Sequence, residues 1–287
     1  MSVDLSQYRR VDNLEEMQNM LRDLMHELHT ICENHGLSYS ITDGTLLGAV
    51  RHNDIIPWDD DIDIIMPRPD YNKLMTIIQQ NYAEEYILYN YPCDGYIYPY
   101  GKFCKKGTLL FEKTLDKKYS QLALYIDIFP LDGFPVLTEK QSDTMFSKAE
   151  KYKNMTARAT GRIFVSSVWW KKPFVIFRWL QKMLLNIPGY KYYLKKQIDI
   201  TKTYAFEDCD DVGFISSWIG GRQGIISKQE FYDQQLYSFG QYSFWGIKNY
   251  DKKLKGLYGD YMTPPPIHQR TAPHAYDLYV KEDNRAN

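Results

Sequence analysis

A run of acidic residues that leads directly into an apolar stretch constrains this chain most. Residues 59–66 read Asp-Asp-Asp-Ile-Asp-Ile-Ile-Met. The β-branched isoleucines favour a strand, and the side chains of a strand alternate between its two faces. Asp61 and Asp63 are therefore expected on one face of a strand over residues 62–66, with isoleucines on the opposite, buried face.

Carboxylates crowded in this way repel one another unless a cation lies among them. Mg²⁺ binds a few carboxylate oxygens and keeps other positions for water and for phosphate oxygens. A strand that holds Asp61 and Asp63 in fixed positions suits this ion. We therefore predict a Mg²⁺ site, with Mn²⁺ as the alternative ion. A solvated acidic turn or an adventitious calcium loop would be the simpler interpretation.

A tight turn upstream of the acidic run is suited to binding phosphate. Residues 40–52 read as the end of a strand, a turn at Gly44 and the start of a helix. Gly44 lets a ligand approach the backbone, and Thr45 offers its hydroxyl and amide at a helix N-terminus, where phosphate is favoured. Many helices begin this way. Followed by an Asp-x-Asp strand, however, the turn matches the arrangement of a nucleotidyltransferase.

A nucleotidyltransferase fold usually has a third carboxylate on a later strand. Residues 125–129 read Tyr-Ile-Asp-Ile-Phe, which places Asp127 among β-branched and aromatic residues. Asp127 would complete the metal shell or accept the proton of an attacking hydroxyl. The simpler alternative for Asp127 is an acidic residue on an edge strand. Asp132 is interpreted as a turn residue before Gly133.

These motifs resemble those of the LicD family of bacterial phosphocholine transferases, which are similar to the fukutin-type polyol-phosphate transferases. Four stretches spread over most of the chain carry the resemblance, namely residues 43–52, 56–63, 126–133 and 257–265. The resemblance implies transfer of phosphocholine from CDP-choline to a sugar hydroxyl of a teichoic acid or similar cell-surface glycan precursor, with release of CMP. Residues 266–270 depart from the acidic residues that more commonly follow the double proline in this family.

Under this interpretation Asp61, Asp63 and Asp127 are the catalytic residues and the metal ligands. Trp58 lies beside the metal strand, and an aromatic ring can hold a trimethylammonium group by cation–π attraction. The predicted donor-binding residues are Gly44, Thr45, Trp58, Lys102, Arg270 and His274.

Basic groups are expected near the donor because its diphosphate and the transition state are anionic. Lys102 resembles the family's lysine at this point, although a lysine that solubilises an edge strand is the alternative. Arg51 and His52 follow the phosphate-side helix, and Arg51 could instead pair with Asp59 or Asp60. Arg270 and His274 resemble the family's basic tail, with a surface loop as the alternative.

The periodicity of apolar residues predicts an α+β fold with a mainly helical C-terminal half. The family resemblance implies that its sheet is a nucleotidyltransferase-like mixed sheet flanked by helices. Residues 1–138 would form the catalytic core. Residues 139–287 would form a basic, aromatic-rich helical region with the C-terminal family motif, packed on the core as one unit. The helices are expected over residues 13–34, 46–51 and 69–80, and the strands over residues 37–42, 62–66, 86–91, 98–104 and 124–129.

Charge is unevenly distributed along the chain. Residues 151–198 contain eleven Lys or Arg and no Asp or Glu, whereas the whole chain has a formal net charge of −1. Basic residues interleaved with Trp, Phe and Tyr suit an anionic membrane surface or a polyanionic glycan. A helical layer with solvated Lys and Arg is the alternative. Nucleic acid is not an expected partner, because no recognisable nucleic-acid module accompanies the basic segment.

The remaining composition predicts a cytoplasmic enzyme, with peripheral contact at the inner face of the membrane through residues 151–198. No apolar run approaches the roughly 20 residues that cross a membrane, and the first residues lack the pattern of a secretory signal. The four cysteines are scattered without zinc-ligand spacing, which favours reduced thiols over a disulfide framework.

Other functions stay open at this point. The donor could be CDP-glycerol or CDP-ribitol in place of CDP-choline. A glycosyltransferase also uses Asp-x-Asp to hold a nucleotide-sugar diphosphate, although it needs neither the turn at Gly44 nor Asp127. A nucleotidyl transfer to a small molecule would release pyrophosphate. A non-catalytic module would bind an anionic envelope polymer without ever releasing CMP.

Overall fold

Two β-sheets organise the chain in a computed structural model that describes residues 4–119, 121–161, 172–216, 221–272, 274 and 276–282. The larger sheet has nine strands, with the order β10-β9-β8-β3-β2-β12-β11 and with β5 also paired to β8 and β4 to β5. Its strands are β2 (Ser40–Ile41), β3 (Asp63–Pro67), β4 (Tyr86–Tyr89), β5 (Gly101–Lys105), β8 (Tyr125–Phe134), β9 (Asp211–Gly213), β10 (Ile225–Ser227), β11 (Gln234–Phe239) and β12 (Tyr242–Ile247).

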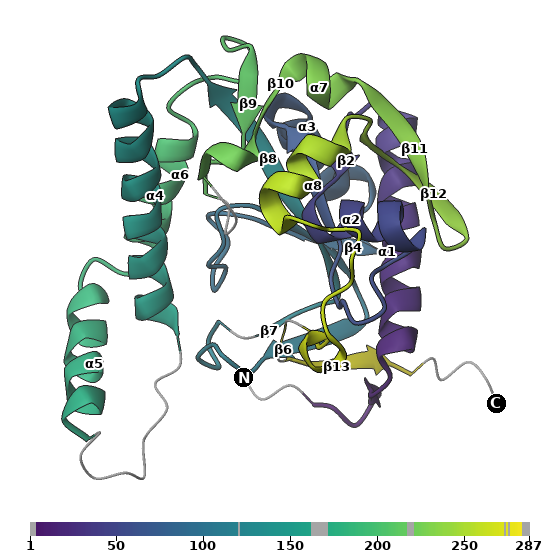
Figure 1. The fold of residues 1–287 in the computed structure, drawn as a ribbon. Helices are drawn as coiled ribbons and strands as arrows, with labels where there is room; N and C mark the ends of the chain where they lie inside the picture. Colours follow the sequence, from purple (N-terminus) through teal and green to yellow (C-terminus); the bar gives the residue numbers. More distant parts are fainter. Residues whose placement is uncertain are drawn as a thin grey trace.

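The smaller sheet has four strands in the order β1-β13-β6-β7 and lies below the larger one in Figure 1. Its strands are β1 (Tyr8–Val11), β6 (Thr108–Glu112), β7 (Gln121–Leu122) and β13 (Tyr276–Lys281). The helices are α1 (Leu14–His35), α2 (Asp43–His52), α3 (Arg68–Asn81), α4 (Glu139–Thr160), α5 (Lys172–Leu185), α6 (Tyr190–Thr201), α7 (Lys228–Tyr232) and α8 (Tyr250–Tyr258), with short 3₁₀ turns η2 (Gly221–Gly224) and η3 (Ile267–Gln269).

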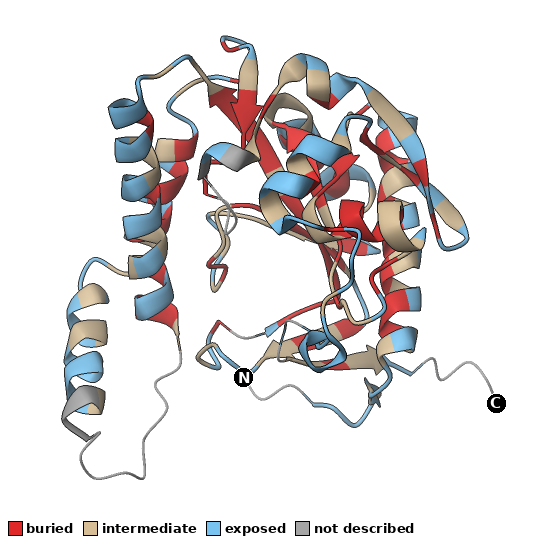
Figure 2. Ribbon diagram, viewed as in Figure 1, coloured by how far each residue is buried: buried red, intermediate tan, exposed pale blue. Residues whose placement is uncertain are grey.

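The main hydrophobic core lies between α1 and the larger sheet. Asn13 caps the start of α1 by accepting from the Glu15 amide, and Gly36 ends the helix with φ = 60°. The apolar stripe of α1 is buried, as the red inner side of this helix shows in Figure 2. The core side chains of α1 meet strand residues from β2, β3, β5, β8, β11 and β12.

The structure confirms a mixed α/β architecture but not a mainly helical C-terminal half. Five strands, β9 to β13, lie beyond residue 139, after the three helices α4, α5 and α6. Residues 234–239 and 242–247 form a hairpin whose strands carry interspersed polar and aromatic residues. A pattern of this kind is typical of a half-buried strand. The hairpin lies after the basic segment 151–198, on which the expectation of a helical C-terminal half is based.

Both sheets combine strands from before and after residue 138. β12 pairs in parallel with β2, β9 pairs with β8, and β13 pairs with β6. The predicted division of the chain into residues 1–138 and 139–287 stays a prediction. β13 also pairs with β1, so the hydrogen bonds of four strand pairs cross that boundary.

Asp132 does not lie in a turn, contrary to the prediction. It belongs to the long strand β8 and is buried, and both of its carboxylate oxygens accept from Arg68 of α3, at 2.8 and 2.6 Å. The neighbouring Pro130 and Gly133 suggest a turn in the sequence. The strand continues past Pro130 because it stays paired with β3 as far as Leu131, and the Arg68 guanidinium compensates the buried charge.

A layer formed by α4 and α6 stands beside the sheets, and α5 extends from it (Figure 1). A separate apolar cluster holds this layer in place; it contains Ile97, Tyr119, Ala159, Tyr190, Leu194 and Ile198. Part of the predicted basic segment, residues 162–171, lies outside the described residues. No helix in the described part of the chain is long and apolar enough to cross a bilayer.

Candidate active site

The strands β3 and β8 bring two of the predicted catalytic carboxylates side by side. They pair in parallel with Asp63 opposite Asp127, and the Asp127 amide donates to the Ile62 carbonyl at 3.0 Å. Asp61 lies just before β3, and its carboxylate acts electrostatically on both Asp63 and Asp127. The three acids, which are separated by up to 66 positions in the chain, therefore meet at one end of two central strands.

Two further carboxylates join this group, and the sequence analysis did not single them out as ligands. One oxygen from each of Asp59, Asp60 and Asp61 lies within 4.8 Å of the others, the one set among the described residues with the spacing of a metal site. Alternation along a strand would separate Asp60 from its neighbours. Residues 59–61 form a loop before β3, however, so that alternation does not apply to them.

Asp60 is also the attachment point of the C-terminal segment. It is 3% exposed, and its Oδ1 lies 2.8 Å from Nδ1 of His274. The Tyr276 hydroxyl donates to the Asp60 carbonyl at 2.6 Å. The hydrogen bond to Asp60 raises the pKa of His274 to about 9, so this imidazole is protonated at neutral pH.

Gly44 and Thr45 lie in the first turn of α2, which begins at Asp43, earlier than predicted. The Thr45 hydroxyl accepts from the Asp63 amide at 2.8 Å and so fixes the start of β3. A Cβ atom on Gly44 would lie 3.1 Å from Oδ2 of Asp59, a tighter contact than side chains usually make. In this structure the turn therefore holds the acidic residues in place.

Lys253 of α8 is a third residue near the site that the sequence did not indicate. Its side chain is 8% exposed, and its ammonium lies 3.3 Å from Asp43 Oδ1 and also donates to the Thr42 hydroxyl. Asp43 itself has a positive φ of 47°, which is uncommon for a residue other than glycine. No motif in the sequence points to Lys253, because it lies far along the chain from its partners.

Lys102 lies inside the protein, with 1% exposure, and its ammonium is 2.5 Å from Oδ1 of Asp127. The ammonium also lies 3.4 Å from the ring centre of Tyr125 and 4.7 Å from that of Tyr98. Contacts of this kind attract an ammonium to the faces of the rings. Lys102 therefore pairs with one carboxylate of the cluster that we call the acidic group. Its members are Asp59, Asp60, Asp61, Asp63 and Asp127.

Trp58 stands among cationic side chains beside the acidic loop. The guanidinium carbon of Arg270 lies 5.1 Å from the Trp58 ring centre and that of Arg51 lies 5.9 Å away. The His52 ring meets Trp58 edge-on at 5.9 Å. Arg51 donates to the Tyr261 carbonyl at 2.6 Å, in place of the suggested pairing with Asp59 or Asp60.

The acidic group holds more negative charge than its lysine and histidine offset. Burial and the neighbouring Asp61 raise the pKa of Asp59 to about 8. Burial, Asp61 and Asp127 raise the pKa of Asp63 well above its ordinary value. Burial raises the pKa of Asp127 to about 6, and the Lys102 ammonium opposes that shift. A carboxylate set with raised pKa values and oxygen donors fits a hard divalent cation.

The stability of the metal-free protein should fall as the pH rises from about 6 to about 9. Asp59, Asp127 and His274 all bind their protons more tightly in the folded than in the unfolded chain. Their contribution is complete below the unfolded pKa values and is lost as the pH rises through the folded ones. Thermal unfolding in EDTA would show Tm decreasing across this range, and a rising Tm would contradict the assignment. Because a metal replaces the protons, Mg²⁺ should raise Tm more at about pH 8 than at about pH 6.

Comparison with known proteins finds a family model and several relatives that are similar to parts or most of this chain. Residues 36–160 match the family model described as LicD/FKTN/FKRP, nucleotidyltransferase domain. A protein of Haemophilus influenzae described as lipopolysaccharide cholinephosphotransferase LicD is 29% identical over 279 residues, covering 93% of this chain and 98% of the relative.

Two rickettsial proteins described as uncharacterized match over shorter stretches. The protein from Rickettsia prowazekii is 45% identical over 60 residues, and that from Rickettsia typhi is 39% identical over 75 residues. Each of these matches spans about a quarter of this chain and of the relative. The carboxylates of residues 59–63 and Asp127 all lie inside the matched domain. Residues 36–160 thus match the nucleotidyltransferase domain of the LicD/FKTN/FKRP family, and the chain is similar to a LicD protein along most of its length.

Proposed function

We propose that this protein is a phosphocholine transferase that uses CDP-choline as donor and a sugar hydroxyl of a cell-surface glycan precursor as acceptor. The observation that carries the proposal is the similarity to a cholinephosphotransferase along 93% of the chain. The convergence of Asp61, Asp63 and Asp127 at adjoining strand ends supports a reaction at phosphate. We further propose a cytoplasmic location.

The carboxylates of the acidic group are the proposed ligands of Mg²⁺, or of Mn²⁺ in its place. We assign Asp61 and Asp63 as ligands, with Asp59 and Asp60 as additional oxygen donors on the loop. Asp127 has two alternative roles, either as a further ligand or as the base that accepts a proton. When bound, such an ion would supply positive charge that offsets the negative charge developing on the donor diphosphate.

Asp127 is the proposed general base. Its pKa near 6 leaves it mostly ionised at neutral pH and still able to take a proton. The acceptor's hydroxyl oxygen would attack the phosphorus that carries choline, forming a new P–O bond. The bond from that phosphorus to the CMP oxygen would break, CMP would leave, and the hydroxyl proton would pass to Asp127. Lys102 holds the carboxylate through its Oδ1, so we assign it a positioning role next to the donor phosphate.

The side chains around Trp58 are the proposed binding site for the rest of the donor. Arg51 and Arg270 place two positive charges within 6 Å of the Trp58 ring, which suits a diphosphate. The protonated His274 adds a third charge beside Asp60 and Asp61. Gly44 and Thr45 would face the donor phosphate from the start of α2.

The nature of the acceptor is proposed from two sources. The relative in Haemophilus influenzae is described as acting on lipopolysaccharide, and the sequence motifs suggest a teichoic acid or similar glycan precursor. Both kinds of molecule carry sugars with free hydroxyl groups. We propose a sugar hydroxyl of such a precursor as the nucleophile.

Purified protein incubated with a panel of CDP-alcohols and Mg²⁺ should release CMP fastest from CDP-choline, in the presence of an envelope glycan fraction. The same reaction in EDTA should fall to background, because the anionic carboxylates would repel the diphosphate. Labelled phosphocholine should appear on the glycan in amounts equal to the CMP released.

Other outcomes of this experiment identify other reactions. Faster release from CDP-glycerol or CDP-ribitol would keep the chemistry and change the donor. Release of UDP from UDP-sugars would indicate a glycosyltransferase, and release of pyrophosphate from a nucleoside triphosphate would indicate nucleotidyl transfer. Binding of glycan with no nucleotide product under any condition would identify a binding module and contradict the proposal.

A further inference from the structure

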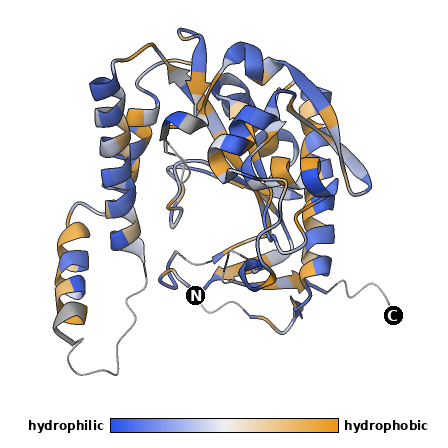
Figure 3. Ribbon diagram, in the orientation of Figure 1, coloured by the Kyte–Doolittle hydropathy of each residue, from blue (hydrophilic) through white to orange (hydrophobic). Residues whose placement is uncertain are grey.

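One side of α5 presents a continuous row of apolar side chains to solvent. At 3.6 residues per turn they occupy a single sector of about 160° around the helix. Figure 3 shows hydrophobic residues alternating with hydrophilic ones along α5, and Figure 2 shows exposed residues along the same helix. We call this row the α5 apolar face; its residues, each 44–64% exposed, are Ile176, Phe177, Trp179, Leu180, Met183 and Leu184.

The opposite side of α5 attaches the helix to the rest of the protein. The Lys182 ammonium pairs with Asp116 and donates to the Gly161 carbonyl at 2.9 Å. Leu185 packs against the apolar cluster beneath α4 and α6. Figure 1 shows α5 at the far end of α4, away from both sheets. The helix is therefore held by one side while its apolar face points outward, and such a patch on a soluble protein marks an interaction site.

The charged residues around α5 indicate which kind of surface this helix would bind. α5 itself contains no acidic residue, and neither does the whole stretch from residue 151 to residue 198. Exposed cations on α4, α5 and α6 include Lys151, Arg158, Arg178 and Lys196. Trp and Phe on one side of a helix with Lys and Arg around it are the pattern of a helix that lies in an anionic lipid interface.

The length of α5 sets its orientation on a bilayer. Its 14 residues extend over about 21 Å, which is shorter than the roughly 30 Å hydrocarbon core. The helix can therefore lie in the plane of the interface and cannot cross it. Burying the six side chains in the acyl boundary would remove their apolar area from water, and the nearby cations would be attracted to acidic headgroups.

We propose that the α5 apolar face docks this protein on the surface of an anionic lipid bilayer, with α5 parallel to the membrane plane. This docking is independent of the identity of the donor and of the reaction at the acidic group. Its consequence is that the active site would work beside lipid-anchored molecules.

The proposal is tested by sedimentation of the full chain with vesicles. Wild-type protein should bind vesicles of phosphatidylcholine and phosphatidylglycerol, and bind vesicles of phosphatidylcholine alone at least about tenfold more weakly. The double variant Trp179→Asp, Leu184→Asp should lose about tenfold or more in partitioning to the anionic vesicles. High salt should weaken the binding of the wild-type protein, because it screens the headgroup charge.

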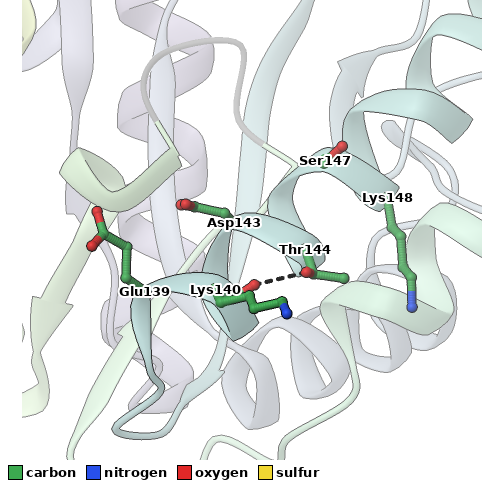
Figure 4. A pocket seen from close by; sticks show the side chains of 6 residues that line it. All are labelled: Glu139, Lys140, Asp143, Thr144, Ser147 and Lys148. Carbon is green, nitrogen blue, oxygen red and sulfur yellow. Dashed lines mark hydrogen bonds between the residues drawn. The ribbon is translucent and has the colours of Figure 1, made fainter.

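The matched control carries the same change of charge on another helix. Thr144 and Ser147 of α4 are exposed and line an open hollow of about 680 Å³ (Figure 4). The variant Thr144→Asp, Ser147→Asp should keep vesicle binding close to that of the wild type. Equal losses in both double variants would overturn the proposal, because only net charge would then matter.

Sedimentation velocity without lipid tests whether the α5 apolar face binds a second copy of this chain instead of a membrane. Wild-type protein that is dimeric and a face variant that is monomeric, with no vesicle binding by either, would assign the α5 apolar face to self-association and overturn the proposal. Donor turnover with a soluble acceptor should be unchanged in the face variant. Loss of vesicle binding with normal turnover would therefore be distinguishable from failure of the proposed reaction.

Discussion

The variant Asp63→Asn should fold normally and lose transferase activity by about a thousandfold or more. Asp63 lies at the centre of the acidic group. It stands opposite Asp127 on the neighbouring strand, and the charge of Asp61 acts on it electrostatically. Asparagine keeps the shape of the side chain and the bond from the residue 63 amide to Thr45, but it removes one anionic oxygen donor. Charge stabilisation by a metal supplies several kcal/mol in phosphate chemistry, and each 1.36 kcal/mol is a factor of ten in rate. Release of CMP from CDP-choline measures the loss.

The stability of the same variant gives an independent measurement. Because Asp63→Asn removes a carboxylate from a repulsive group, its Tm in EDTA should equal or exceed that of the wild type. Its increase in Tm on addition of Mg²⁺ should be smaller than that of the wild type. The control Asp199→Asn changes a carboxylate of α6 that pairs with Lys195 at the surface, and it should leave activity and the response to Mg²⁺ unchanged. Full activity of Asp63→Asn would remove Asp63 from the reaction.

The variant Arg68→Met should lose about 3–5 kcal/mol of unfolding free energy, the largest loss we expect from a change outside the acidic group. Arg68 and Asp132 form a two-point ion pair, and their side chains are 13% and 3% exposed. Removal of the guanidinium leaves a buried carboxylate without its partner, which costs far more than the loss of a surface pair. Urea unfolding followed by circular dichroism measures the change at about pH 8. The loss should be smaller at about pH 5, where Asp132 can take up a proton.

A control on the same helix separates burial from the loss of a positive charge. Lys73 of α3 pairs with Asp70 at 3.4 Å, but its side chain is 64% exposed. Lys73→Met should therefore change the unfolding free energy by no more than about 1 kcal/mol. The double variant Arg68→Met, Asp132→Leu should recover most of the loss, because no buried charge remains. Equal effects of Arg68→Met and Lys73→Met would show that the Arg68 pair contributes as little as a surface pair.

The sequence predicted the elements around the acidic group well, because their signals are local. α1 and α3 begin and end within one residue of their expected ranges, since an apolar stripe, a cap and an early proline mark them. The pairing of β3 with β8 could be expected from Asp-x-Asp and from the apolar context of Asp127. The turn at Gly44 was also visible, although α2 begins three residues earlier than the helix expected there.

The parts that the sequence did not predict depend on contacts between distant segments. Lys253 reaches Asp43, and His274 reaches Asp60, from elements that follow long stretches of unrelated chain. The burial of Asp132 could not be seen either, because its compensating charge comes from Arg68 on another element. Three-dimensional pairing of this kind leaves no periodic trace in a single sequence.

The parallel pairing of β12 with β2 sets the order in which this protein can be completed during translation. The acidic strand β3 and its neighbour β2 leave the ribosome early, whereas β12, which covers the other edge of β2, is synthesised near the end. Until then the nascent chain exposes an open strand edge, and such edges invite pairing with other chains. Distant pairings also form slowly. The chain must therefore be synthesised as far as β12 before the open edge of β2 is covered. That length extends well beyond residues 36–160, which match the family model.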